Sequence, residues 1–209
     1  MRTLFVGDVH GCSAELAALL AQAAADRVVL LGDLFNKGPD APGVWQLIQE
    51  HGCEAILGNH DAHVLARVGR PGALDLPAAA IDWLRRLPLH RQGVTPDGRA
   101  WLAIHAGLDP VGGLAATTRE QALVVRRWPD DSDLDNPFWW ERWQGPPLVL
   151  YGHDAVRGLV DRRPHSLGLD SGCVYGKALS GYLLEEDRIL QVPAARAWRV
   201  IPARPPGHG

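Results

Sequence analysis

Short apolar runs alternate with longer alanine- and leucine-rich segments through the first third of the chain. The runs have the length of β-strands, and the segments between them have helix-forming composition. This alternation is typical of parallel strands joined by crossover helices, and it predicts an α/β sandwich. The expected strands are Thr3 to Val6, Val28 to Leu31, Glu54 to Leu57, Trp101 to Ile104, Leu148 to Tyr151, and a final hairpin of Ser180 to Leu184 with Arg188 to Val192.

Four helices are expected between and after the first strands. They cover Ala14 to Ala25 with Ser13 as N-cap, Gly43 to Glu50, Asp61 to Val68, and Ala78 to Arg86. The later half is less regular, and the acidic segment from Asp130 to Asn136 has the composition of a solvated loop. We expect one domain over residues 1–196, followed by a flexible tail over residues 197–209 that is rich in proline and glycine.

Composition narrows the classes of protein that this chain can represent. A net charge of -3 offers no basic surface for long nucleic-acid tracts. The cysteines, Cys12, Cys53 and Cys173, are odd in number and lack C-x-x-C spacing, so neither a disulfide framework nor a cysteine zinc site is expected. No leader pattern and no apolar run of about 18 residues is present, which predicts a cytoplasmic protein without a membrane span. Nothing in the composition indicates the oligomeric state.

Polar side chains follow each of five predicted strands, at the point where the strand ends. Any one of these motifs is also explained by an ordinary Asp/Gly turn or a core histidine. Their recurrence favours loops that converge on one cluster, because open α/β sheets place their sites beyond the carboxyl ends of the strands. The motifs are Gly7-Asp8-Val9-His10-Gly11, Gly32-Asp33, Gly58-Asn59-His60-Asp61, His105-Ala106-Gly107 and Gly152-His153.

This set of oxygen and imidazole ligands suits two divalent metal ions. A bridging carboxylate holds two cations about 3.5 to 4 Å apart, where they clamp a phosphoryl group and acidify a shared water. Asp33 is the expected bridge. Asp8 and His10 complete one site, and the other takes Asn59, His105 and His153. The centre keeps net positive charge for an anionic substrate.

His60 is adjacent to Asn59 but points the other way in an extended segment. We therefore assign it to the leaving group, as a general acid whose pKa a nearby carboxylate sets. The alternative is a histidine that caps backbone groups at the start of a helix.

The ordered motifs GDVHG, GDLFNKGPD, GNHDAH, IHAG and YGHDA resemble those of the calcineurin-like metallophosphoesterases. The resemblance covers about residues 3–185 and implies a four-layer α-β-β-α sandwich. It implies the same six metal ligands, Asp8, His10, Asp33, Asn59, His105 and His153, and the same general acid, His60.

This chain departs from the family's protein phosphatases at Asn36-Lys37, where they carry Asp-Arg. The usual carboxylate partner of the acid histidine is therefore absent at that position. Asp61 is a candidate substitute in the catalytic site, although a helix N-terminus is also a sufficient reason for an aspartate. Lys37 can meet a phosphate as a point charge but lacks the bidentate fork of arginine.

The resemblance also predicts a phosphate-binding arginine in the later half, for which Arg126 and Arg127 are the candidates; a solvated helix end explains either equally. Asn59 is expected to face the substrate as well as a metal ion.

The Trp139-Trp140-x-x-Trp143 cluster can stack an adenine or pack under a lid. The mixed oxygen and nitrogen ligands favour Mn, Fe, Co, Zn or Ni over Ca, and Mn is the metal that we expect.

Within the family, GNHDAHVLA, IHAGLDP and LDSGCVYG are closest to the symmetrical diadenosine tetraphosphate hydrolases. The expected function is therefore hydrolysis of dinucleoside polyphosphates, with diadenosine tetraphosphate split into two ADP. The alternatives are a protein serine/threonine or tyrosine phosphatase, whose substrate is a phosphoprotein, and a non-catalytic phosphate-binding protein with the same fold.

Overall fold

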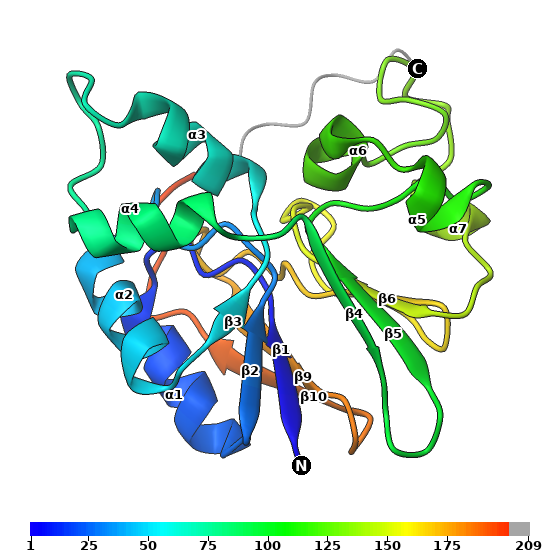
Figure 1. Ribbon diagram of the computed structural model, residues 1–209, viewed down its shortest axis with the longest axis horizontal. Coiled ribbons are helices and arrows are strands. Elements are labelled where there is room, and N and C mark those ends of the chain that lie inside the picture. Colours follow the sequence, from blue (N-terminus) through cyan, green and yellow to red (C-terminus); the bar gives the residue numbers. More distant parts are fainter. Residues whose placement is uncertain (201–209) are drawn as a thin grey trace.

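Two five-stranded sheets form the centre of the computed structural model, which describes residues 1–200 (Figure 1). The first sheet has the order β10-β9-β1-β2-β3, and the second has the order β4-β5-β6-β8-β7. The strands of the first sheet are β1 (Thr3–Val6), β2 (Arg27–Leu30), β3 (Glu54–Ala55), β9 (Ala178–Leu183) and β10 (Arg188–Pro193). Those of the second are β4 (His90–Val94), β5 (Ala100–Ile104), β6 (Leu148–Tyr151), β7 (Val160–Arg162) and β8 (Ser166–Gly168).

The strand pairing confirms the predicted crossover pattern in the first third of the chain. Strands β1, β2 and β3 are parallel neighbours, and the predicted final hairpin adds β9 antiparallel to β1 and β10 antiparallel to β9. In the second sheet β5, β6 and β8 are parallel. The carboxyl ends of both sets of parallel strands therefore open toward the same edge, at the top of Figure 1.

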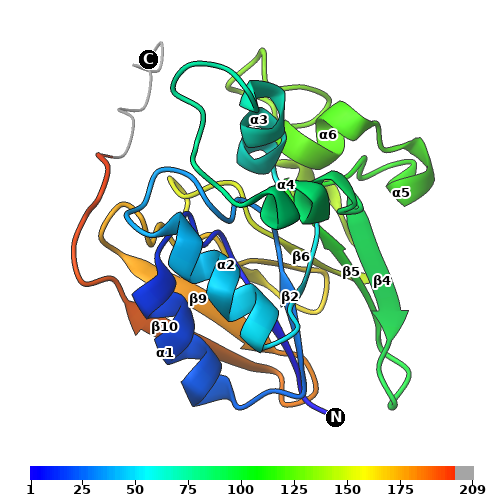
Figure 2. The same ribbon diagram turned by 60° about the vertical axis from the view of Figure 1, so that its left-hand side comes forward.

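Helices cover the outer face of each sheet. Helices α1 (Ser13–Ala23) and α2 (Ala41–Glu50) lie side by side on the first sheet (Figure 2). Helices α3 (Asn59–Arg67) and α4 (Ala78–Arg85) follow β3. Three short helices accompany the second sheet: α5 (Gly113–Ala116), α6 (Arg119–Val124) and α7 (Trp139–Arg142).

Three apolar clusters hold these layers together. Alternate residues of β1 face opposite sides, so Leu4 and Val6 pack against the helices of the first sheet while Phe5 lies between the two sheets with Trp101. On the outer face of the second sheet, Leu102 and Val149 pack with residues of α6 and α7. The order of layers is therefore helix, sheet, sheet, helix, the four-layer α-β-β-α sandwich that the resemblance implies.

Several local expectations were wrong. Ser13 is the first residue of α1 rather than its N-cap; Cys12 holds that position, and the Ser13 hydroxyl donates instead to Asp40. Strands β4, β7 and β8 and helices α5, α6 and α7 were not predicted. These elements are short, and β4 alternates exposed and half-buried residues, so its burial comes from pairing with β5 rather than from an apolar run.

The end of the described chain still contacts the domain. The backbone N–H groups of Trp198 and Arg199 both donate to the Val174 carbonyl, and Ala197 pairs with Tyr175. The predicted tail therefore starts too early at residue 197, and its remainder, residues 201–209, lies outside the described residues. Among residues 1–200, no helix combines the length and the apolar character that crossing a bilayer requires.

Candidate metal centre

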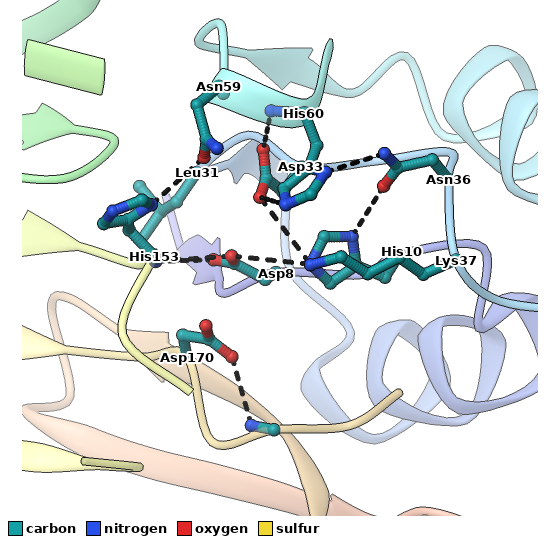
Figure 3. A network of polar contacts seen from close by, with 12 residues as sticks. Asp8, His10, Leu31, Asp33, Asn36, Lys37, Asn59, His60, His153 and Asp170 are labelled. Carbon is teal, nitrogen blue, oxygen red and sulfur yellow. Dashed lines mark hydrogen bonds and ion pairs between the residues drawn. The ribbon is translucent and has the colours of Figure 1, made fainter. Parts of the chain in front are cut away.

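All six predicted metal ligands lie together where the loops leave β1, β2, β3, β5 and β6. Figure 3 labels five of them: Asp8, His10, Asp33, Asn59 and His153. Three of them, His10, Asp33 and His153, have positive φ angles of 47°, 56° and 72°. Non-glycine residues adopt this left-handed region at a cost of about 1 kcal/mol or more, and such residues concentrate at functional sites. The loops thus hold these side chains in positions that an unstrained backbone does not supply.

Asp33 lies at the centre of the group, and its two carboxylate oxygens face different ligands. Oδ2 is 3.6 Å from Nε2 of His10, whereas Oδ1 is 3.5 Å from Nε2 of His105. Asp8 extends the first side, with its Oδ2 4.0 Å from His10 Nε2. Asp33 would therefore contribute to the ligands of both ions if two cations were bound here.

Asn59 and two histidines form the second side. The Asn59 Oδ1 atom lies 2.9 Å from His105 Nε2 and 3.0 Å from His153 Nδ1. The opposite ring nitrogens contact backbone carbonyls, those of Leu31 at 2.7 Å and Val124 at 3.1 Å. Those carbonyls can only accept, so they fix the tautomers that leave a lone pair on each ring nitrogen facing Asn59.

Two glycines make room for the carboxylates. A Cβ at Gly152 would lie 2.0 Å from Oδ1 of Asp8, and one at Gly58 would lie 2.2 Å from Oδ1 of Asp33. Any side chain at either position would therefore displace an expected ligand. This explains the glycine that precedes Asn59 and His153 in their motifs.

Burial sets the protonation preferences of the site. It raises the pKa of Asp33 to about 7 and that of Asp8 well above its usual range, with the neighbouring carboxylates adding to the effect on Asp8. It lowers the pKa of His10 and His153 well below the usual value, so both imidazoles are neutral at pH 7. Neutral imidazoles are the ligand form, and the positive charge of Lys37 only partly offsets the burial of Asp8 and Asp33.

The partner of His60 is Asn36 rather than a carboxylate. The Asn36 Nδ2 atom lies 2.8 Å from His60 Nδ1, and its Oδ1 lies 3.0 Å from His10 Nδ1 (Figure 3). The His60 Nε2 atom points inward, 4.0 Å from Asp33 Oδ2. His60 therefore presents one ring nitrogen to the cavity and the other to an amide.

Asp61 does not lie in the catalytic site, for which the sequence made it a candidate. Its carboxylate accepts hydrogen bonds from three backbone N–H groups, those of Asp33 at 2.8 Å, Leu34 at 2.9 Å and Gly58 at 3.1 Å. It is 1% exposed and does not line the cavity. The helix N-terminus accounts for this aspartate, which positions the Asp33 loop against α3.

The three basic candidates for phosphate binding are placed differently. Lys37 and Arg126 line the cavity, with Lys37 Nζ 3.1 Å from His10 Nε2 and Arg126 Nε 3.9 Å from Asp154. Arg127 points elsewhere, since its guanidinium lies 4.4 Å from the Phe138 ring centre and donates to the Asn136 carbonyl. Of the two arginines, only Arg126 is in position to meet an anion in this cavity.

Sequence reasoning missed two carboxylates that line the same cavity. Asp170 follows β8, and burial raises its pKa to about 6; Asp154 directly follows the ligand His153. Both positions carried a signal. Asp170 comes after a short apolar run, Leu167 to Leu169, in the same way as the motifs that were recognised, but β8 itself was not predicted.

The residues present fit two divalent cations. The carboxylates of Asp8 and Asp33 are buried beside the ammonium group of Lys37, the one cationic side chain among described residues that reaches His10. The donor set combines carboxylate, amide and imidazole atoms and contains no thiolate, which suits Mn, Fe, Co, Zn or Ni. Two of the groups of potential ligand atoms that lie within 4.8 Å of one another share Asp33: His10, Asp33 and His60, and Asp8, Asp33 and His105.

Comparison with known proteins agrees with this geometry. The sequence profile of the calcineurin-like phosphoesterases matches residues 1–189. A symmetrical bis(5'-nucleosyl)-tetraphosphatase of Shewanella oneidensis is 35% identical, over 90% of this chain and 96% of its own length, and one of Paracidovorax citrulli is 30% identical, over 84% and 89%. The first alignment spans 268 positions although this chain has 209 residues, so the relative carries segments that this chain lacks.

A solved structure of a candidate diadenosine tetraphosphatase superposes with a TM-score of 0.84 at 34% identity, over 92% of this chain and 93% of its own. The profile covers most of the chain, and the relatives are matched over most of their length. The metal-ligand motifs and the four layers are the features on which sequence and structure agree. The chain therefore belongs to the calcineurin-like phosphoesterase family.

Proposed function

We propose that this protein hydrolyses dinucleoside polyphosphates and splits diadenosine tetraphosphate into two molecules of ADP, with Mn as the metal of its centre. The observation that carries the proposal is the position of Asp33, whose two oxygens face two separate sets of ligands in a cavity of about 180 Å³. The symmetrical tetraphosphatases similar to this chain supply the substrate class.

The residues of the cavity have separate roles in the proposed reaction. Two cations bound by Asp8, His10, Asp33, Asn59, His105 and His153 would acidify a shared water and polarise the phosphoryl oxygens. Lys37 and Arg126, which both line the cavity, would bind the anionic chain. His60 holds a ring nitrogen toward the cavity, where it would donate to the oxygen of the departing nucleotide.

We further place this activity in the cytoplasm. The thiols of Cys12, Cys53 and Cys173 are free and buried, which suits a reducing compartment.

The test is hydrolysis by chelator-stripped protein with Mn or Co restored. Diadenosine tetraphosphate is the substrate, the nucleotide products are separated by chromatography, and a phosphopeptide panel is run in parallel. ADP alone supports the proposal. ATP with AMP contradicts symmetrical cleavage, and turnover of phosphopeptides alone indicates a protein phosphatase. Unchanged activity in both Asp33→Ala and His60→Ala would contradict catalysis at this centre.

A further inference from the structure

A second hollow adjoins the metal-binding cavity on the side of His60. The two share Lys37, Asn59 and His60, and the second extends to residues of α3 and to the end of α6. We call them the inner cavity and the outer hollow. The outer hollow is lined by Asn36, Lys37, Asn59, His60, His63 and Val124.

The two spaces differ in size. The inner cavity has a volume of about 180 Å³, whereas the outer hollow has about 540 Å³. Pockets that bury small organic ligands usually measure about 300 to 1,000 Å³. The inner cavity can therefore take metal ions and a phosphoryl group, and the outer hollow has room for a nucleotide.

They also differ in charge. Four carboxylates line the inner cavity, those of Asp8, Asp33, Asp154 and Asp170. Lys37 lines both spaces and Arg126 lines the inner cavity, so the contrast is that the residues lining the outer hollow include no carboxylate. A polyphosphate chain that leaves the inner cavity thus meets less repulsion toward the outer hollow than along the carboxylate-lined wall.

Two side chains give the outer hollow a partly apolar surface. His63 lies on α3 three residues after His60, so the two rings project from the same face of the helix. Val124 ends α6, and the residue is 36% exposed. Its carbonyl accepts from His153 Nε2 at 3.1 Å, which fixes Val124 beside the metal centre.

We propose that the outer hollow binds the departing nucleotide, with its base stacked on the His63 imidazole and packed against Val124. This inference rests on the proposed function, because a dinucleoside substrate carries a nucleoside on each side of the bond that breaks. His60 lies where the two spaces meet and so has the departing nucleotide beside it. Stacking on an aromatic ring tolerates any base, which suits general recognition of nucleotides.

The test is calorimetric binding of ADP and of inorganic phosphate to protein loaded with Mn. We expect His63→Ala to weaken ADP binding about fivefold or more while phosphate binding is unchanged, because stacking is lost and the metal centre is kept. His63→Phe should restore ADP binding, since an aromatic face is what the base requires. His51→Ala, an exposed histidine at the end of α2 outside both spaces, should behave as wild type.

Equal ADP affinity in His63→Ala and wild type would overturn the inference, and so would parallel losses for ADP and phosphate. Failure of the proposed function is a separate result. It is absence of diadenosine tetraphosphate turnover by the wild type, measured in the same preparation. If the wild type hydrolyses diadenosine tetraphosphate but His63→Ala binds ADP normally, only the outer nucleotide site is contradicted. If ADP binding depends on His63 but the wild type does not hydrolyse diadenosine tetraphosphate, only the proposed substrate is contradicted.

Discussion

Asn36 contacts two histidines that have different tasks in the proposed mechanism. His10 presents Nε2 to the carboxylates, so its Nδ1 carries a proton and donates to Asn36 Oδ1. The amide Nδ2 must then donate to His60 Nδ1. This bond favours neutral His60, and together with burial and the charge of Lys37 it agrees with a pKa of about 4 for that imidazole.

Replacing Asn36 by aspartate should therefore change how activity depends on pH. In Asn36→Asp a carboxylate faces His60 Nδ1 and stabilises the imidazolium, which raises the pKa of His60. We expect the alkaline fall of kcat to move up by about one pH unit, because the acid form survives to higher pH. Profiles of kcat against pH for wild type, Asn36→Asp and the uncharged Asn36→Ala provide the measurement. An unshifted alkaline limb in Asn36→Asp would show that His60 is not the acid.

At the scale of elements, the carboxylate of Glu54 links the two sheets through their edge strands β3 and β4. Glu54 on β3 accepts from Arg27 Nε of β2 at 2.6 Å and lies 2.7 Å from Arg91 Nη1 of β4. Arg91 also donates to the Ala55 carbonyl at 3.2 Å. Because β3 and β4 belong to different sheets, this cluster ties the sheets together near the edge strands.

Glu54→Gln should lower the free energy of unfolding by about 1 kcal/mol at pH 7, a modest value because the side chain is 31% exposed. The arginine contacts lower the pKa of Glu54, so its contribution is present above the unfolded pKa and is lost as pH falls. Urea titrations of both proteins should therefore show a smaller difference in unfolding free energy between Glu54→Gln and wild type at pH 4 than at pH 7. Glu50→Gln, at an exposed residue that ends α2 and forms no ion pair among residues 1–200, is the control and should change nothing measurable. An equal loss at both pH values would contradict the ionic origin.

Helix α7 depends on one tryptophan for its attachment. Trp139 is 1% exposed, donates from Nε1 to the Ala106 carbonyl at 3.0 Å, and meets the ring of Tyr151 edge-on. Trp140 is half-buried and stacks on Phe138. Of the two roles considered for the tryptophan cluster, packing is therefore the one that Trp139 fills.

Trp139→Ala should destabilise the protein by about 3 to 5 kcal/mol, since it leaves a cavity and an unpaired carbonyl beside His105, one of the expected metal ligands. Trp140→Ala, one residue away on the same helix, should cost less than half as much because its ring is only partly buried. Chemical denaturation of both variants measures the difference. Similar losses for the two would show that the buried contacts of Trp139 do not anchor α7.

At the scale of the whole molecule, the sequence predicts which loops meet at the candidate metal centre better than it predicts the second sheet, whose short strands also contribute to that centre. Asp8, His10 and Asp33 follow uninterrupted apolar runs whose ends are marked by glycine, so their convergence follows from the rule for parallel sheets. Strands β7 and β8 are three residues each, and their pairing is non-local, so Asp170 went unassigned. Asn36 was seen only as a lost carboxylate, because its contact with both His10 and His60 depends on two loops meeting.

Metal binding should stabilise the whole fold, and more at high pH than at low pH. A ligand at about a hundred times its Kd adds about 2.7 kcal/mol, which corresponds to a rise in Tm of about 5 to 10 °C for a domain of this size. Burial raises the pKa of Asp33 to about 7 and of Asp170 to about 6, so the metal-free fold loses stability as pH rises from the unfolded pKa of about 3.9 to these folded values. The cations compete with protons for Asp33 and Asp170. His60, with a pKa of about 4, binds few protons at pH 5.5 and so contributes little to this pH dependence.

We therefore expect the gain in Tm on adding Mn to chelator-stripped protein to be several degrees larger at pH 8 than at pH 5.5, as measured by calorimetry. Asp33→Asn removes the bridging charge and should lose most of the gain at both pH values. Asp75→Asn, an exposed aspartate in the loop before α4, should keep it. The same gain at pH 5.5 and pH 8 would mean that the buried carboxylates do not hold the cations. The ligands would then have to be sought among groups that do not titrate in this range.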